Sequence, residues 1–232
     1  MASTPHPAKI VIGGILLCVP AFLAVLAVPR VLQGVAAEPF HHVIDQAELG
    51  EHLQPEAYRA AADALSGAAS DDGEALADRA QTLVLSADND PATLARARAL
   101  VVQSLRAAPT SPSAWLLLCQ IDARRGPGAA NPCLANALKI APYDWYTTER
   151  RTLLIADQWP YLDERVRDKA VTLILPMWTT RFLLSDATLH GVLYELSLTE
   201  NGRELLRAGF AGHRDDLREF NRFVIAEQGR EQ

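Results

Sequence analysis

The chain has 232 residues, a formal net charge of −6, 49% hydrophobic residues and 6% aromatic residues. This length is sufficient for one domain with a buried core and an additional segment. Ala and Leu dominate the composition, which favours an all-α fold. Residues 38–90 contain twelve acidic residues and two arginines, whereas residues 91–232 contain sixteen acidic and eighteen basic residues. Because no basic stripe is present, the sequence excludes nucleic acid from the expected partners.

An uncharged segment near the N-terminus predicts a transmembrane helix. Residues 10–28 lack charged side chains and are bracketed by Lys9 and Arg30. Nineteen helical residues extend about 28 Å, which is close to the thickness of the hydrocarbon core of a bilayer. We therefore expect residues 1–9 to form a short cytoplasmic tail and residues 10–30 to form a transmembrane helix.

A cleaved signal peptide is the alternative interpretation, because residues 35–37 (Val-Ala-Ala) fit a small-residue cleavage site. The apolar segment is longer than that of a typical signal peptide, which favours a retained anchor. Nineteen arginines against three lysines are typical of a GC-rich bacterial genome. We therefore expect a single-pass protein of a bacterial inner membrane, in contact with membrane lipid. Its juxtamembrane linker (residues 31–54) and helical domain (residues 55–232) would lie in the periplasm.

Four potential metal ligands follow the apolar segment. His41, Asp45, Glu48 and His52 would share one face of a continuous helix and could together hold a divalent cation. The alternative is a solvated juxtamembrane segment, which the surrounding acidic residues and the lack of a closed ligand set favour. The sequence therefore predicts no metal site and no other cofactor.

Prolines predict where the helices of the soluble part begin. Three N-cap residues stand directly before a proline, in Asp90-Pro91, Ser111-Pro112 and Asn131-Pro132. The helices expected from these starts are 91–107, 112–125 and 132–141. Flanking helices are expected around 55–68, 73–86, 186–198, 202–209 and 213–227. No segment alternates apolar and polar residues as a strand would, so the predicted fold class is all-α.

An internal period is visible in the prolines. Pro109, Pro142 and Pro176 are spaced by 33 and 34 residues, and residues 104–109 (SLRAAP) are echoed by residues 137–142 (ALKIAP). With Trp115 after the first proline, residues 91–176 resemble degenerate tetratricopeptide (TPR) repeats of the single-pass, membrane-anchored bacterial envelope type. This resemblance implies antiparallel helix pairs that form a TPR-like domain. We expect Trp115 and Leu105 to be core positions of the repeat.

Two cysteines lie in the predicted helical domain. Cys119 and Cys133 fall on consecutive helices, and an oxidising periplasm would allow a disulfide between them. Their axial offset of roughly 6 Å is near the upper limit for a bridge. The sequence therefore leaves two interpretations open, a disulfide or two buried thiols that fill small gaps between helices.

Aromatic residues and arginines gather between positions 143 and 178. Such a combination is typical of protein contact sites. The candidate partner-binding residues are Tyr143, Trp145, Tyr146, Arg150, Arg151, Trp159, Tyr161, Arg165 and Arg167. Trp178 belongs to the same cluster. The alternative interpretation is that most of these aromatic residues form the helical core.

The sequence contains no G-x-S-x-G, Walker A, H-E-x-x-H or paired C-x-x-C motif, so no enzymatic activity is expected. Pro20 would kink the membrane helix, which favours partner helices beside it. The leading hypothesis is a non-catalytic periplasmic scaffold or accessory subunit that binds membrane protein subunits of an envelope complex, such as polysaccharide synthesis or export machinery. The alternatives are a glycan-binding module and an accessory subunit of a membrane bioenergetic complex.

Overall fold

The computed structural model describes residues 42–43, 46, 53–65, 72–87, 89–180 and 186–230. Within these ranges all regular secondary structure is helical, which confirms the predicted all-α class. The predicted transmembrane helix (residues 10–30) and the four potential metal ligands in residues 41–52 lie outside the described residues. Among the residues that are described, no helix is long and apolar enough to span a membrane.

The described helices follow one another closely along the chain. Their bounds are α2 (Pro55–Ala64), α3 (Gly73–Ser86), α4 (Pro91–Ala107), α5 (Pro112–Ala123), α6 (Asn131–Ile140), α7 (Trp145–Asp157), η2 (Trp159–Tyr161), α8 (Glu164–Thr179), α9 (Asp186–Leu198), α10 (Glu200–Gly209) and α11 (Arg214–Arg230). The helix starts expected at residues 55, 73, 91, 112 and 186 are confirmed. Helices α7 and α8 have no counterpart among the helix bounds expected from the sequence.

Side-chain caps explain why most of these helices begin where they do. Asp90 accepts hydrogen bonds from the backbone N–H groups of Ala92 and Thr93, and Ser111 accepts one from Ala114. Asp144 and Asp163 cap α7 and α8 in the same way. Each cap satisfies backbone donors that have no partner within the first helical turn. The starts are therefore determined locally, by short polar side chains and by prolines at the first helical position.

Two consecutive helix pairs are related by an offset of 33 residues. Helices α5 and α7 begin at residues 112 and 145, and α6 and α8 begin at residues 131 and 164. The residues that end α4 and α6, Ala108 and Ala141, have φ/ψ angles of −133°/75° and −138°/67°, so the echoed segments before Pro109 and Pro142 share one conformation. Pro176, the third proline of the period, differs from Pro109 and Pro142 because it lies inside a helix, α8. In the last turn its missing N–H removes a single helical bond.

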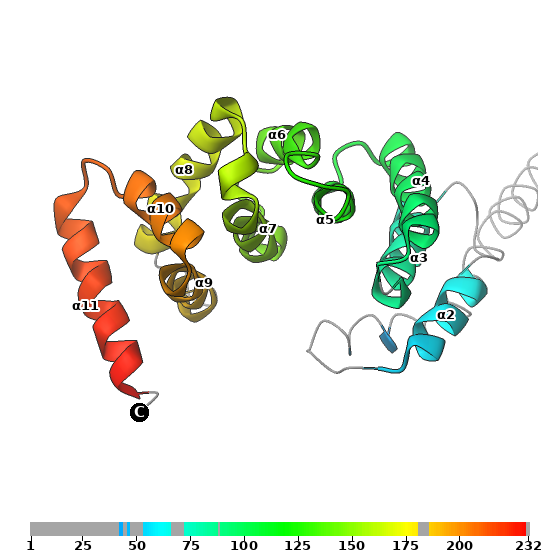
Figure 1. Cartoon of the computed structure of the whole chain (residues 1–232), viewed down its shortest axis with the longest axis horizontal. Coiled ribbons are helices and arrows are strands. Elements are labelled where there is room, and N and C mark those ends of the chain that lie inside the picture. The colour runs from blue at the N-terminus through cyan, green and yellow to red at the C-terminus, as the bar shows by residue number, and fades with distance from the viewer. Residues whose placement is uncertain are drawn as a thin grey trace, which may run out of the picture.

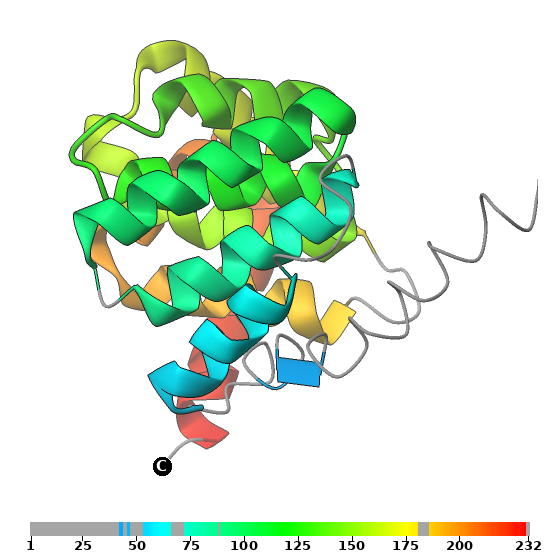
Figure 2. The same cartoon turned by 90° about the vertical axis from the view of Figure 1, so that its right-hand side faces the viewer.

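The helices form two layers that stack into an arch (Figure 1). In the inner layer α3 contacts α5, α5 contacts α7, and α7 contacts α9. The outer layer contains α4, α6, α8 and α10, with contacts from α6 to α8 and from α8 to α10. Figure 2, turned by 90°, shows successive helices running alongside one another. Because the inner helices lie on the lower side of the arch in Figure 1, they form its concave face.

One continuous hydrophobic core lies between the two layers. Leu105 and Trp115 are partly buried and pack against it, and the Trp115 indole Nε1 donates to the backbone carbonyl of Pro109 at 2.9 Å. At the C-terminal end, Trp178 packs between His190, with ring centroids 4.6 Å apart, and Phe220 at 5.4 Å. These aromatic contacts attach α9 and α11 to α8 and close this end of the arch.

Candidate functional site

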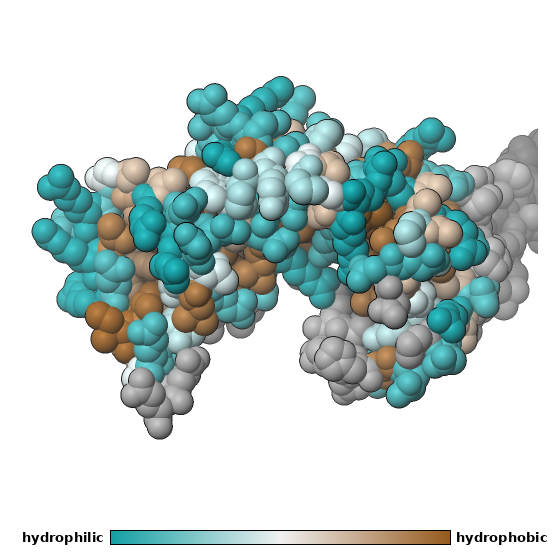
Figure 3. Space-filling model, in the orientation of Figure 1, coloured by the Kyte–Doolittle hydropathy of each residue, from teal (hydrophilic) through white to brown (hydrophobic). Residues whose placement is uncertain are grey.

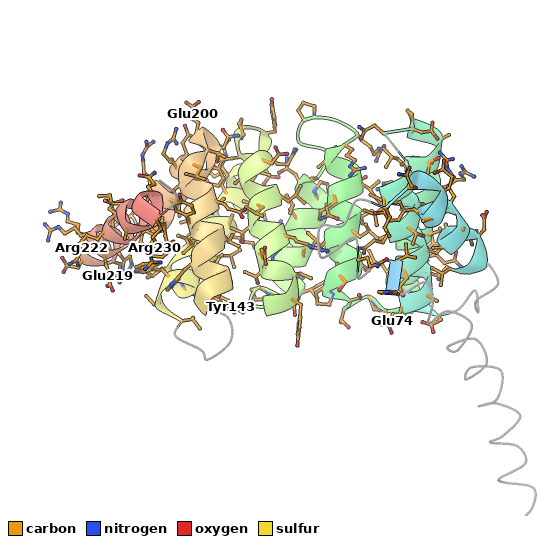
Figure 4. All side chains as sticks on the ribbon, turned by 90° about the horizontal axis from the view of Figure 1, so that it is seen from below. Glu74, Tyr143, Glu200, Glu219, Arg222 and Arg230 are labelled. Carbon is orange, nitrogen blue, oxygen red and sulfur yellow. The ribbon has the colours of Figure 1, made fainter. Side chains whose placement is uncertain are left out.

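A groove of about 420 Å³ crosses the concave face of the arch. It is lined by residues of three successive inner helices and the residues that follow α5 and α7: Gln81, Val84, Leu85, Leu117, Gln120, Ala123, Arg124, Arg150, Leu154, Asp157 and Gln158. We call this surface the concave groove. Figure 3 shows the molecule hollowed on its lower side between the two ends of the arch. Figure 4, seen from below, shows the inner helices side by side across this face.

Helical spacing places the lining side chains on one face of each inner helix. Residues four positions apart lie above one another on a helix, so α3, α5 and α7 each present such a pair to the groove. The pairs are Gln81 with Leu85, Gln120 with Arg124, and Arg150 with Leu154. Each pair combines a polar group that can form hydrogen bonds with either an apolar side chain or a cation. The groove can therefore contact both the backbone and the side chains of a bound chain.

Gln158 contributes a buried polar atom to the concave groove. Its side chain is 8% exposed, and its amide Nε2 donates to the Asp157 carboxylate at 2.9 Å. The Gln158 Oε1 atom is buried and has no hydrogen-bond partner among the described residues. An unsatisfied buried acceptor costs about 1–3 kcal/mol, and a ligand in the groove does not reach this atom in the present side-chain conformation.

A second groove, of about 590 Å³, lies where α4 begins and α5 ends. We call it the edge groove, and its lining residues are Asn89, Pro91, Leu94, Ala95, Arg98, Ala99, Arg124 and Arg125. Arg124 also lines the concave groove, so the two surfaces are continuous. Three arginines around an apolar floor give the edge groove a different chemistry from the amide-rich concave groove.

The structure does not bring the predicted aromatic residues together on one surface. Tyr143 and Tyr146 are 54% and 93% exposed and follow the C-terminal end of α6. Tyr161 lies at the other end of that helix, where its backbone carbonyl accepts a hydrogen bond from the Asn131 side chain. Ten helical residues separate these positions by about 15 Å. Figure 4 places Tyr143 along the same edge of the concave face as Glu74, at the start of α3.

The two predicted tryptophans whose side chains are described belong to the core. Trp159 and Trp178 are 6% and 8% exposed, and the Trp159 indole Nε1 donates to Glu204 at 3.0 Å. Arg167 lies over the Trp159 ring at 5.4 Å and donates to the Trp159 carbonyl at 3.0 Å, so it positions η2. The side chain of Trp145 lies outside the described residues. The alternative interpretation of the cluster as core therefore holds for Trp159 and Trp178.

The predicted arginines also separate into different environments. Arg150 lines the concave groove, and Arg165 is exposed on α8. Arg151 is 1% exposed and donates to the backbone carbonyls of Ala141 and Pro142, at 2.5 Å and 2.7 Å. Burial lowers the pKa of the Arg151 guanidinium, while the nearby Asp144 raises it. Arg151 thus closes the C-terminal end of α6, where carbonyl groups lack helical partners, and it does not face a partner.

Cys119 and Cys133 are free, buried and in contact. Cys119 is hydrogen-bonded to Cys133, whose thiol donates to the Ala130 carbonyl at 2.9 Å. Burial raises the pKa of the Cys119 thiol, and the contact with Cys133 raises it further. The Cys119 thiol is therefore protonated and unreactive as long as the fold excludes solvent from it.

The comparisons with known proteins identify no relative. No protein-family model matches the chain, and neither a curated protein nor a solved structure matches it. The described residues contain no group of three or more metal-ligating side chains. The functional proposal therefore depends on the two grooves. The sequence analysis did not identify the glutamines of the concave groove, Gln81, Gln120 and Gln158, because nothing in the local sequence marks an amide as a binding group.

Proposed function

We propose that this chain is a non-catalytic scaffold or accessory subunit of a bacterial envelope complex, in which a TPR-like helical domain binds a segment of a partner protein. The concave groove across α3, α5 and α7 is the observation that carries the proposal. Helical repeat proteins commonly bind their partners on the extended concave surface that their stacking creates. The offset of 33 residues between successive helix pairs supports the TPR-like interpretation.

The dimensions of the concave groove fit an extended peptide. Neighbouring helices pack about 8–10 Å apart, so a groove across three helices spans roughly 20 Å. An extended chain advances about 3.3 Å per residue, so six residues would cross it. The amide group of Gln120 can pair with the peptide backbone, because it offers both a donor and an acceptor. Such pairing would fix the register of the peptide while its side chains contact Leu85 and Leu154.

The proposal includes a membrane anchor at residues 10–30. The uncharged nineteen-residue sequence within this range supports it, because that length matches the hydrocarbon core of a bilayer. An anchor in the inner membrane would hold the helical domain in the periplasm beside membrane protein subunits. The effective concentration of a tethered domain at the membrane makes even a short peptide contact sufficient for association.

A glycan-binding module is the second candidate function. Tyr143 and Tyr146 favour it, because two exposed aromatic side chains close together in the sequence between α6 and the start of α7 could stack on sugar rings. Trp159 and Trp178 are buried and cannot contribute to such a surface. Substituting both tyrosines with alanine separates the candidates, because only glycan binding requires their rings.

Copurification from mild detergent tests the proposal with a pair of matched variants. Gln120→Ala removes an amide from the concave groove, whereas Asn136→Ala removes an exposed amide from α6 in the outer layer. We expect a membrane protein partner to be recovered with the wild-type chain in fixed stoichiometry. Gln120→Ala should reduce this recovery about fivefold, the effect of one net hydrogen bond, while Asn136→Ala leaves it unchanged. Equal recovery with both variants would contradict a role for the groove.

A further inference from the structure

The edge groove combines an apolar floor with fixed positive charge. Pro91, Leu94, Ala95 and Ala99, all from α4, form the floor, and the guanidinium groups come from Arg98, Arg124 and Arg125. Arg124 and Arg125 are exposed at the end of α5, so a ligand can reach them. Pockets of about 300–1,000 Å³ accommodate ligands or a few side chains of a partner, and this groove of about 590 Å³ falls within that range.

A buried carboxylate holds two of these arginines in place. Asp122 is 5% exposed, and its Oδ1 accepts hydrogen bonds from Arg98 Nε at 2.7 Å and from Arg125 Nη1 at 3.0 Å. Its Oδ2 accepts a second bond from Arg98 Nη2 at 3.2 Å. The bidentate pairing leaves the remaining N–H groups of Arg98 in a fixed orientation. A guanidinium that is already oriented loses little entropy when it binds an anion.

The charges of the edge groove do not cancel. Asp122 neutralises one of three arginines, so the groove has a net charge of +2 from its lining residues and Asp122. The nearby Asp90 carboxylate accepts hydrogen bonds from Thr93 at the N-terminus of α4 and lines a different pocket, so it is not counted among the charges of the edge groove. The helix dipole places a partial negative charge of about half an elementary charge at the C-terminus of α5. This charge is smaller than the positive charge of the two arginines that follow the helix.

We propose that the edge groove binds an acidic segment of the partner protein, with its carboxylates on Arg98, Arg124 and Arg125 and an apolar side chain on Pro91 and Leu94. This proposal deepens the proposed function and rests on it. The charge of the groove favours an anionic group such as a carboxylate, and its floor favours an adjacent apolar side chain. Arg124 belongs to both grooves, so a single extended segment can pass from the concave groove into the edge groove. The partner is therefore defined as a protein with an extended segment in which acidic and apolar residues alternate.

Fluorescence anisotropy of labelled hexapeptides with the purified full-length chain tests this inference. One peptide alternates glutamate and leucine, and the other alternates glutamine and leucine. At about 50 mM salt, where exposed charges are weakly screened, we expect the acidic peptide to bind about tenfold more tightly. Equal affinity for both peptides would overturn the proposal, and so would preferential binding of a soluble short-chain phosphatidylglycerol, which would assign the groove to a lipid headgroup.

Three variants locate the binding to the edge groove. Arg125→Gln removes an exposed charge that lines the edge groove and not the concave groove, and Arg98→Lys keeps Asp122 paired while it loses the bidentate geometry. Each should weaken binding of the acidic peptide about tenfold, with thermal unfolding measured in parallel. Arg222→Gln on α11 is the matched control and should leave the affinity unchanged. An equal loss with Arg222→Gln would overturn the proposal, because the binding would then depend on overall charge alone.

Copurification with the variants of both grooves distinguishes a failure of this inference from a failure of the proposed function. If Gln120→Ala reduces recovery of the partner while Arg125→Gln and Arg98→Lys do not, the edge groove has no role and the concave groove remains the docking site. If neither set of variants changes recovery, both proposals fail.

Discussion

The buried guanidinium of Arg151 provides the sharpest test of the fold. We predict that Arg151→Met, which keeps most of the side-chain volume, destabilises the domain by about 2–4 kcal/mol. The substitution leaves the carbonyls of Ala141 and Pro142 without their donor, and each buried unsatisfied carbonyl costs about 1–3 kcal/mol. Removing a buried charge returns part of this cost, since Arg151 Nε is itself buried without a partner among the described residues.

Thermal unfolding followed by circular dichroism measures this effect. For a domain of this size, 1 kcal/mol shifts the melting temperature by roughly 3 °C, so Arg151→Met should lower it by about 6–12 °C. Arg165→Met on the exposed surface of α8 is the matched control and should change it by less than about 2 °C. A melting temperature of Arg151→Met that equals that of the control would refute the conclusion that Arg151 closes α6.

Three further predictions concern packing, redox chemistry and acid stability. In Gly209→Ala the added Cβ would clash with the Ile174 side chain of α8, which should destabilise the domain by at least about 2 kcal/mol. In Gly191→Ala the added Cβ meets no atom within 4 Å, so this variant should stabilise the domain by roughly 0.5–1 kcal/mol. A reversed order of melting temperatures would contradict this packing. Cys119 and Cys133 are free and buried, so they should resist alkylation in the native protein and be labelled in denaturant without reductant; protection in denaturant that only reductant removes would contradict the free thiols. The hydroxyl and backbone N–H groups that bond Asp90 lower its pKa below 3.8, so its contribution to stability is present above this pH and is lost as the pH falls through the lowered pKa. The melting temperature should therefore depend less on pH between pH 2 and pH 6 in Asp90→Asn than in the wild type. An unchanged pH dependence would show that the cap does not titrate.

Helix boundaries could be predicted from the sequence because they depend on neighbouring residues. The N-cap of α4 and the proline after it lie side by side in the chain, and the predicted span 91–107 matches the structure. Helix α8 could not be delimited in this way. Pro176 signals a helix end in the sequence, but packing of α8 against α6, α9 and α10 stabilises a helix that continues to Thr179.

Burial within α7 could not be predicted because the first half of its buried face is polar. Thr147, Thr148, Arg151 and Thr152 are all at most 4% exposed. Hydropathy assigns such residues to the surface, so the sequence placed Arg151 beside Arg150 in a contact site. Adjacent residues on a helix differ in direction by about 100°, which is enough to put one in the core and the other in the groove.

The concave groove could not be predicted because it is assembled from residues distant in the chain. Gln81 and Gln158 line the same groove although 77 positions separate them. Their proximity depends on how α3, α5 and α7 stack, which is determined by packing between helices and not by the sequence of any one helix. The acidic and basic composition of the chain likewise did not indicate the edge groove, because its charge excess arises from three arginines that the fold brings beside one buried carboxylate, which pairs with two of them.

Site-specific photocrosslinking in intact membranes tests most directly whether the concave groove docks a partner. A photoreactive residue replaces Gln120 in the groove, and the same residue replaces Asn136 on the outer layer as the control. The proposal predicts one discrete adduct with a membrane protein from position 120, none from position 136, and loss of the adduct when Leu85→Glu is added in the groove. An adduct of equal yield from both positions, or one that persists with Leu85→Glu, would contradict docking in the concave groove.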